Sequence, residues 1–191
     1  MHELIEKRWS PRAFNGQPVE HEKLKELFEA ARWAASCFNE QPWRFVYATR
    51  EEKELFRKLF DCLVERNQQW VKTAPLLLLT VARRDFSHNG KPNRHAWHDV
   101  GLALGNFTLQ AAALGLFVHQ MAGFSSEKAR ENLGIPAEFE PVAMAAVGYP
   151  GDAAQLPEEL RAREGAPRTR KPLADIVFHG AWHNDSGPAE T

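Results

Sequence analysis

The chain has 191 residues, with 24 lysines and arginines against 25 aspartates and glutamates. That length is enough for one domain with a hydrophobic core and too short for two comfortable ones, and a net charge of −1 gives no basic excess of the kind that nucleic-acid-binding proteins show. We therefore predict one domain over residues 1–182, followed by a disordered tail over residues 183–191.

Cysteine content and hydropathy indicate the compartment. Cys37 and Cys62 are too few to form a disulfide framework, which favours a reducing environment. The N-terminus has no apolar core of a secretory signal, and the longest apolar run, residues 75–82, is far too short to span a membrane. We expect a cytoplasmic protein that binds neither membrane nor nucleic acid.

A short basic segment follows a predicted helix over residues 3–8. Arg8 and Arg12 flank Ser10, and Pro11 pushes Ser10 toward extended geometry. Guanidinium groups match phosphate oxygens in bidentate fashion, and a serine hydroxyl adds a neutral donor. The segment is either an anion-binding site or a charged turn on a solvated surface.

A polar stretch over residues 36–45 joins a predicted helix over residues 20–35 to a predicted strand over residues 45–49. Asn39 and Gln41 provide planar groups with both donors and acceptors. With the flat ring of a nearby tryptophan, this chemistry suits a planar heterocycle with polar edges. The alternative is a polar surface turn whose tryptophan belongs to the core.

The middle of the chain predicts a long helix and a buried strand. Apolar residues recur at helical spacing over residues 51–72, with Asn67 toward the end of that helix. The run over residues 75–82 fits an interior strand buried on both faces. Residues 83–95 form a long polar loop, which is often functional in a compact domain.

Histidines after this strand raise the possibility of a metal site. His88, His95, His98 and Asp99 lie close together in sequence, but no cysteine or glutamate completes a recognised zinc signature. We favour a polar loop that opens a helix with Asp99 in its first turn, and expect no metal.

Residues 99–114 predict a helix that is apolar on nearly every side, so it lies in the core or at a dimer interface. Further strands are expected over residues 116–121 and 141–149, with a helix over residues 127–133 between them. Gly123 stands where the first of these strands meets that helix, a position where backbone N–H groups can approach a ligand.

The C-terminal region is expected to hold a weak helix over residues 153–165, then a basic segment. Arg168 and Arg170 belong either to a solvated linker or, with Arg8 and Arg12, to a phosphate clamp. Residues 173–182 are apolar enough that we expect them to dock on another surface.

Together these segments resemble the FMN-dependent nitroreductase superfamily. The resemblance covers about residues 3–182. It is carried, in the family's order, by residues 8–14, 36–45, 121–124, 147–150 and 168–173. It implies a three-layer α+β fold with a central mixed sheet flanked by helices, in an intertwined homodimer whose two FMN sites lie at the interface.

The resemblance also implies which residues bind FMN, in four groups. The phosphate would be held by Arg8, Ser10, Arg168 and Arg170. The pyrimidine edge of the ring would face Arg12 and Asn67. The other subunit would reach the flavin with Ala35, Ser36, Cys37 and Asn39. Flavin N5 would face the backbone of Ala122 and Gly123.

The implied activity is transfer of a hydride from NAD(P)H, through flavin N5, to a nitroaromatic, quinone or enone-like acceptor by a ping-pong mechanism. No protein acid or base is assigned, because water can supply the protons. Three alternatives stay open: a non-catalytic FMN-binding protein for storage or sensing, a family member with another reductive activity such as dehalogenation, and a histidine-dependent metalloprotein.

Overall fold

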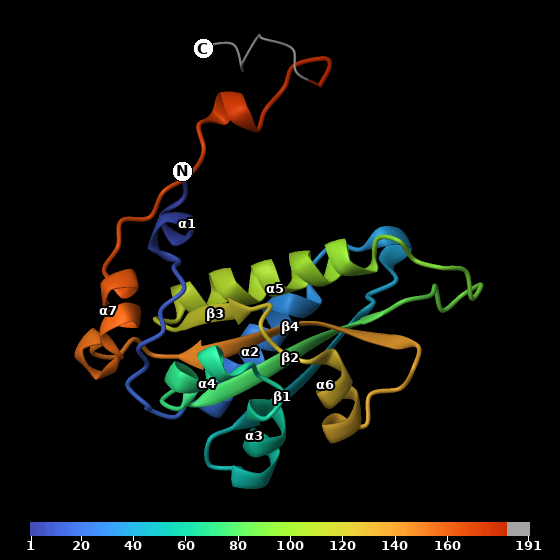
Figure 1. Ribbon diagram of the computed structural model, residues 1–191. Helices are drawn as coiled ribbons and strands as arrows, with labels where there is room; N and C mark the ends of the chain where they lie inside the picture. The colour runs from blue at the N-terminus through green and yellow to red at the C-terminus, as the bar shows by residue number, and fades with distance from the viewer. Residues whose placement is uncertain (183–191) are drawn as a thin grey trace.

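The computed structural model describes residues 1–182 and has an α+β fold built on a four-stranded sheet. The strands are β1 (Trp43–Thr49), β2 (Leu76–Arg83), β3 (Phe117–Met121) and β4 (Phe139–Gly148). They lie in the order β1-β2-β4-β3, so β2 and β4 occupy the centre (Figure 1). β2 is buried over nearly its whole length, which confirms the predicted interior strand.

The sheet is antiparallel throughout the described residues, so the prediction of a mixed sheet was wrong for this part of the chain. The connections explain the difference. Thr49 pairs with Leu76, so the chain leaves β1 and enters β2 at the same end of the sheet. β2 and β3 do run in the same direction, but β4 lies between them and pairs with both.

Helices cover both faces of the sheet and give the predicted three layers. α2 (His21–Arg32) and α5 (Ala96–Ala113) pack on one face, over Leu76 and Leu78 of β2. The opposite face carries the other core cluster, which includes Leu77 of β2. This alternation follows from the two-residue period of a strand.

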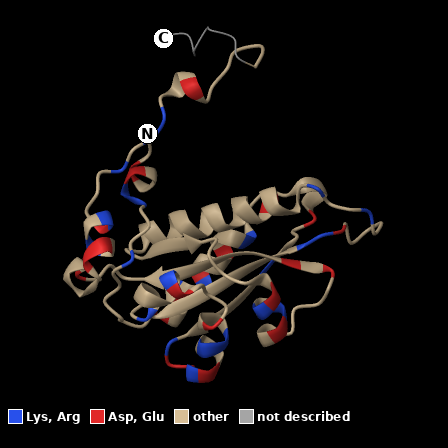
Figure 2. Cartoon of the chain, viewed as in Figure 1, with Lys and Arg blue, Asp and Glu red and all other residues tan. Residues whose placement is uncertain are grey.

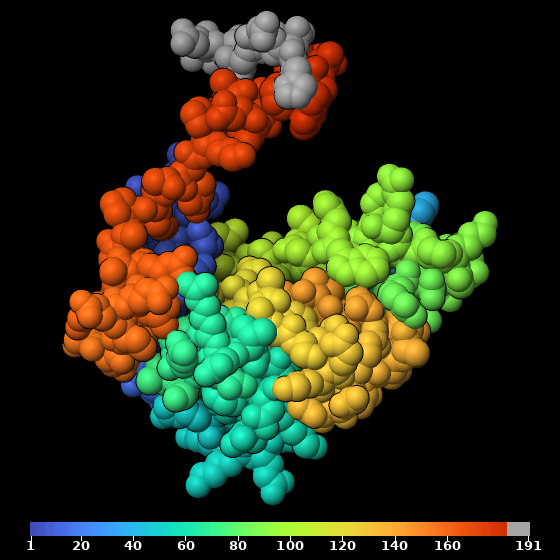
Figure 3. Space-filling view, in the orientation of Figure 1, coloured from blue at the N-terminus to red at the C-terminus, as the bar shows by residue number. Residues whose placement is uncertain are grey.

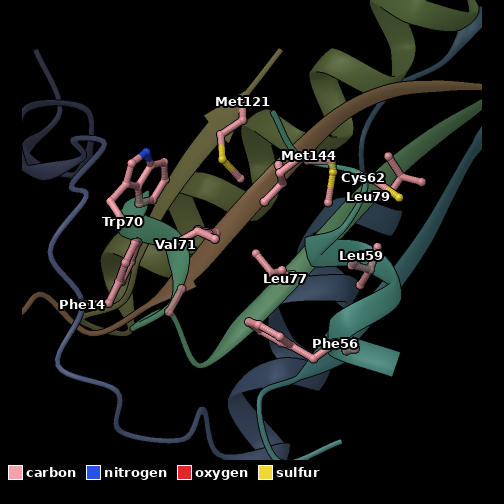
Figure 4. Close-up of a cluster of buried hydrophobic side chains, with 14 of the residues drawn as sticks. Phe14, Phe56, Leu59, Cys62, Trp70, Val71, Leu77, Leu79, Met121 and Met144 are labelled. Atoms are coloured by element: carbon pink, nitrogen blue, oxygen red, sulfur yellow. The ribbon is translucent and has the colours of Figure 1, made fainter. Parts of the chain in front are cut away.

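Figure 4 shows the second cluster, where side chains from two helices meet the sheet. Phe56 and Leu59 come from α3 (Lys53–Phe60), and Trp70 comes from α4 (Glu65–Val71).

α3 and α4 were predicted as one helix over residues 51–72, and the structure corrects this. Leu63 instead forms a β-bridge with Phe124. The N–H of Val64 donates to the carbonyl oxygen of Gly123 over 3.1 Å, and Ser125 N–H donates to that of Cys62 over 2.8 Å. The interruption therefore brings the start of α4 against the turn that follows β3.

The remaining helices agree with their sequence signals. They are α1 (Glu3–Lys7), α6 (Ser126–Leu133) and α7 (Glu158–Glu164). α6 begins as predicted, because the Ser125 hydroxyl accepts a hydrogen bond from the N–H of Lys128 over 3.2 Å. It ends at Gly134, whose φ of 65° is the left-handed conformation that glycine adopts readily. Short 3₁₀ turns occupy Cys37–Asn39, Ala153–Gln155 and Leu173–Asp175.

The C-terminal segment after α7 leaves the body of the molecule (Figures 1 and 3). Leu173 is 63% exposed and Ile176 is 57% exposed, so these apolar side chains are not buried against the rest of this chain. The surface on which residues 173–182 are predicted to dock is therefore not on the body of the same chain. The predicted tail over residues 183–191 lies outside the described residues. Within residues 1–182, no helix is both long and apolar enough to span a membrane.

Candidate functional site

Three guanidinium groups gather where the N-terminal segment meets the chain that follows α7. The Arg168 side chain donates to the carbonyl oxygens of Arg8 and Glu6, each over 2.7 Å. Burial lowers the pKa of Arg8, and the charges of Arg170 and Arg168 lower it further. Figure 2 shows the blue positions of the two segments close together. Among residues 1–182, none of these three arginines forms a salt bridge, so the cluster favours an anion.

Ser10 lies within this cluster, and the side chains of Glu164 and His119 hold the segment that carries it. The hydroxyl of Ser10 accepts a long contact of 3.4 Å from Arg8 Nη1. Glu164 of α7, whose side chain is only 4% exposed, accepts from the N–H groups of Arg12 and Ala13 over 2.8 and 3.0 Å. Its carboxylate also lies 3.7 Å from the Arg12 guanidinium. The carboxylate thereby fixes both the backbone and the side chain of Arg12.

His119 of β3 holds the same segment from the other side. Its Nδ1 lies 3.0 Å from the carbonyl oxygen of Ser10 and 2.9 Å from that of Pro11. The imidazole packs on the ring of Trp70, with 4.6 Å between ring centroids. Four successive residues, 10–13, are thus anchored through their backbone by two side chains from β3 and α7.

A pocket of about 310 Å³ opens beside this anchored segment. Arg12, Arg66 and Arg163 line it together with the amide side chains of Asn67 and Gln120. No carboxylate lines it among the described residues. Its volume is at the lower end of the range for cofactor sites, and its charge favours a ligand with an electron-rich or anionic edge.

Gly123 and Asn67 both line this pocket and contact each other. The Asn67 side-chain amide donates to the carbonyl oxygen of Gly123 over 3.0 Å. A Cβ at Gly123 would lie 2.8 Å from Asn67 Nδ2 and 2.9 Å from Val64 Cγ2, so the approach of α4 depends on glycine. The N–H of Gly123 donates to no other described residue, which leaves it available to a ligand. Ala122 also lines the pocket.

The other predicted group, Ala35, Ser36, Cys37 and Asn39, is not in this pocket. The N–H of Cys37 donates to Asp99 Oδ2 in the first turn of α5 over 3.0 Å. The Ser36 hydroxyl accepts from Gln41 N–H over 3.0 Å. This group therefore lies beside the N-terminal end of α5.

α5 separates the two groups of predicted residues. α1, which leads into Arg8, packs at the opposite end of α5, where Leu4 and Ala113 line one hollow. From Asp99 to Ala113 the axis of α5 rises by about 21 Å, at 1.5 Å per residue. One chain therefore does not bring the two groups together.

The backbone of residues 36–41 is strained. Phe38, Asn39 and Gln41 have φ values of 52°, 54° and 52°, which non-glycine residues rarely adopt. Phe38 is also 82% exposed. Strain of this kind collects at ligand-binding and active sites, where surrounding contacts maintain it.

The histidine cluster considered as a metal site serves other contacts. The Asp99 carboxylate accepts from Cys37 N–H and lies 3.0 Å from His98 Nδ1. Within residues 1–182, no group of three or more histidine, cysteine, aspartate or glutamate side chains is arranged to hold a metal ion.

Comparison with known proteins identifies the family. The sequence profile of the Nitroreductase family matches residues 5–149, well over half of the chain. The chain belongs to the nitroreductase family. The α+β nitroreductase fold expected from its sequence motifs is thereby confirmed.

Several relatives are similar over most of this nitroreductase-family chain. An NADH dehydrogenase of Thermus thermophilus is 30% identical, over 90% of this chain and 92% of its own. Human iodotyrosine deiodinase 1 is 26% identical, over 92% of this chain and 67% of its own.

Solved structures show the same similarity. The crystal structure of an oxidoreductase containing FMN superposes with a TM-score of 0.91 at 39% identity, over 98% of this chain and 94% of that one. A nitroreductase family protein of Clostridium difficile 630 gives a TM-score of 0.73 at 29% identity, over 95% of this chain and 100% of that one.

Sequence reasoning missed two sets of residues at this site of the nitroreductase-family chain. The first set holds the anchored segment and consists of Trp70, His119 and Glu164. The second lines the pocket with polar groups and consists of Arg66, Gln120 and Arg163. His119 had one signal, because a polar residue in a mainly apolar sequence segment calls for a specific partner. Glu164 had none, since an acidic residue near the end of a polar helix is usually solvated.

Proposed function

We propose that this chain is an FMN-dependent oxidoreductase that transfers electrons from NADH or NADPH to a nitroaromatic, quinone or enone-like acceptor. The observation that carries the proposal is the cluster of Arg8, Arg168 and Arg170, which has no carboxylate partner in the described chain and adjoins a pocket without carboxylates. Similarity to the FMN-containing oxidoreductase supports the same cofactor.

The residues present fit FMN. Arg8, Ser10, Arg168 and Arg170 would hold its phosphate, whose charge would offset both the burial of Arg8 and its repulsion by Arg170 and Arg168, the causes that lower the pKa of Arg8. The pocket would take one edge of the ring, with Arg12 and Asn67 beside it. When bound, FMN supplies the two-electron transfer chemistry that amino-acid side chains lack.

The protein contributes position and electrostatics. Arg12, held through its backbone and side chain by Glu164, would present a fixed positive charge to negative charge that develops on the ligand. The free N–H of Gly123 would donate to a ligand acceptor, and Ala122 lines the pocket next to it. We assign no side chain as a general acid or base.

We further propose a homodimer that completes each site. Ala35, Ser36, Cys37 and Asn39 do not line the pocket of their own chain and would approach the pocket of a second copy. An open stretch on α5 supports this proposal. A Cβ at Gly101 or Gly105 would meet nothing within 4 Å, and Leu102 is 40% exposed. Small residues on a helix allow close approach of another backbone.

An absorption spectrum tests the proposed cofactor and reaction together. Purified protein is expected to be yellow, and its flavin band is expected to bleach when NADH or NADPH is added without oxygen. Addition of a nitroaromatic or quinone is then expected to restore the band. Colourless protein that does not take up added FMN would overturn the cofactor, whereas a bound flavin that stays oxidised would favour a storage or sensing role.

Reductive dehalogenation is a second candidate, which the similarity to human iodotyrosine deiodinase 1 favours. Anaerobic turnover of an iodinated tyrosine, with release of iodide, would distinguish it from reduction of nitroaromatic acceptors.

A further inference from the structure

His119 has a tautomer that the chain itself fixes. Its Nδ1 faces two carbonyl oxygens, those of Ser10 and Pro11, at 3.0 and 2.9 Å. Carbonyl oxygens only accept hydrogen bonds, so Nδ1 must carry a proton and donate to them. In the neutral ring the other nitrogen, Nε2, then has a free lone pair and acts as an acceptor.

The surroundings of His119 favour this neutral form. Burial lowers the pKa of His119, and the positive charge of Arg12 lowers it further, while the two carbonyl contacts and Glu164 partly oppose the shift. The other charged side chains that line its pocket are Arg66 of α4 and Arg163 of α7. At neutral pH the ring therefore keeps its lone pair on Nε2.

His119 lines the pocket, and no described residue donates a hydrogen bond to its Nε2. Most polar groups around the pocket are donors: three guanidinium groups belong to Arg12, Arg66 and Arg163. The Nε2 atom of half-buried His119 is thus a hydrogen-bond acceptor with a fixed direction among side chains that are mostly donors. An acceptor in this position suits an N–H or O–H group of a ligand.

We propose that His119 has two roles at this site: its Nδ1–H positions the turn at Ser10 and Pro11, and its Nε2 accepts a hydrogen bond from an N–H or O–H group of bound FMN. The proposal rests on the proposed function, because it concerns the same pocket. It adds a cofactor-binding residue that none of the sequence motifs contains.

Two substitutions separate the roles. His119→Asn keeps an amide N–H near the position of Nδ1, so the turn retains a donor while the pocket loses its acceptor. His119→Gln places an amide oxygen near the position of Nε2, so the pocket retains an acceptor that does not titrate. His21→Asn, on an exposed residue at the start of α2, is the matched control.

The measurement is the dissociation constant of FMN for each apoprotein, followed by flavin fluorescence between about pH 5 and 8. Wild type and His21→Asn are expected to bind more weakly as the pH falls toward the lowered pKa of His119, because a protonated Nε2 donates and no longer accepts. His119→Asn is expected to bind roughly three- to tenfold more weakly at neutral pH. Its acid-side dependence is expected to be shallower than that of wild type, with the remainder due to the second ionisation of the FMN phosphate at about pH 6. His119→Gln is expected to stay near wild type at neutral pH and to show the same shallower acid-side dependence as His119→Asn.

Flavin analogues identify the donor. If methylation of flavin N3 removes the penalty of His119→Asn, the imide N–H is the partner; if the penalty persists, a ribityl hydroxyl is. The proposal is overturned if His119→Asn, folded as judged by its melting temperature, binds FMN with the affinity and pH dependence of wild type. Failure of wild type to bind FMN overturns the proposed function and this proposal with it, whereas normal wild-type binding with an unchanged variant overturns this proposal alone.

Discussion

Arg8 is half-buried beside Arg168 and Arg170, and an anion would stabilise all three side chains. Arg8→Gln is expected to weaken FMN binding by about 1.5–3 kcal/mol, the range for a hydrogen bond to a charged group. Fluorescence titration of the apoprotein measures this change. Arg32→Gln is the control, because Arg32 has a 61% exposed side chain and pairs with Glu29. Equal FMN affinity in both variants would place the phosphate elsewhere.

Glu164 is the buried carboxylate on which the position of Arg12 depends. In Glu164→Gln an amide N–H₂ group replaces one carboxylate oxygen and cannot accept from the backbone. The free energy of unfolding is expected to fall by about 1–3 kcal/mol, as measured by urea denaturation. Glu159→Gln, on the same helix but with a 79% exposed side chain, is expected to change it little. A similar loss in both variants would contradict this role.

Protonation of His119 gives stability a pH dependence of known sign. Its pKa in the folded protein is lowered from the ordinary 6.5, so the unfolded chain binds the proton first as the pH falls. The stability that neutral His119 contributes is fully present above pH 6.5, the pKa in the unfolded chain. It is lost as the pH falls from 6.5 to the pKa of the folded protein, and a further fall in pH changes it no more. Apoprotein melting temperatures are expected to show a shallower acid-side decline in His119→Gln than in wild type. Parallel declines would exclude His119 as the cause.

At the scale of elements, the contact of α4 with the turn after β3 depends on one glycine. A Cβ in Gly123→Ala would approach Asn67 Nδ2 and Val64 Cγ2 to within 2.8 and 2.9 Å. We expect the free energy of unfolding of this variant to be about 1–3 kcal/mol lower than that of wild type, which is the range for overpacking. Gly165→Ala, where a Cβ would meet nothing within 4 Å, serves as the control. If Gly123→Ala is as stable as Gly165→Ala, α4 shifts to accommodate the added methyl group without loss of stability.

Elements with local signals could be predicted from the sequence. β2 followed from an uninterrupted apolar run, and α6 from Ser125 and Gly134 at its ends. The break between α3 and α4 could not, because the apolar stripe continues across it. What ends α3 is pairing of Leu63 with Phe124, far along the chain, and a tertiary contact of this kind overrides local helical propensity.

The residues of the candidate site also divide into those with a local sequence signal and those without one. Arg8, Ser10 and Arg12 were found from residue type and spacing. Glu164 contacts Arg12 across 152 positions of sequence, and His119 reaches Ser10 across 109, so neither contact leaves a local pattern. Sequence could therefore predict the basic and hydroxyl groups of residues 8–12, but not the distant side chains that hold them in position.

At the scale of the whole molecule, the open face of α5 predicts that oligomeric state and cofactor binding are linked. Gly105→Leu would fill the space that a second helix needs, and is expected to shift a dimer toward monomer in analytical ultracentrifugation. FMN is expected to dissociate from this variant, and from wild type on dilution. Gly165→Leu is expected neither to shift the dimer toward monomer nor to release FMN. A monomer with undiminished FMN affinity would contradict a shared site.

The length of α5 between the two groups of site residues has a genetic consequence. If each site draws on both chains, a variant defective at Arg8 and a variant defective at Ser36 damage different halves of it. Mixing the two inactive proteins, or expressing both in one cell, would assemble heterodimers in which one site receives two undamaged halves. Random pairing in a two-fold symmetric dimer would restore about a quarter of the wild-type sites. Two variants with substitutions in the same half would restore none.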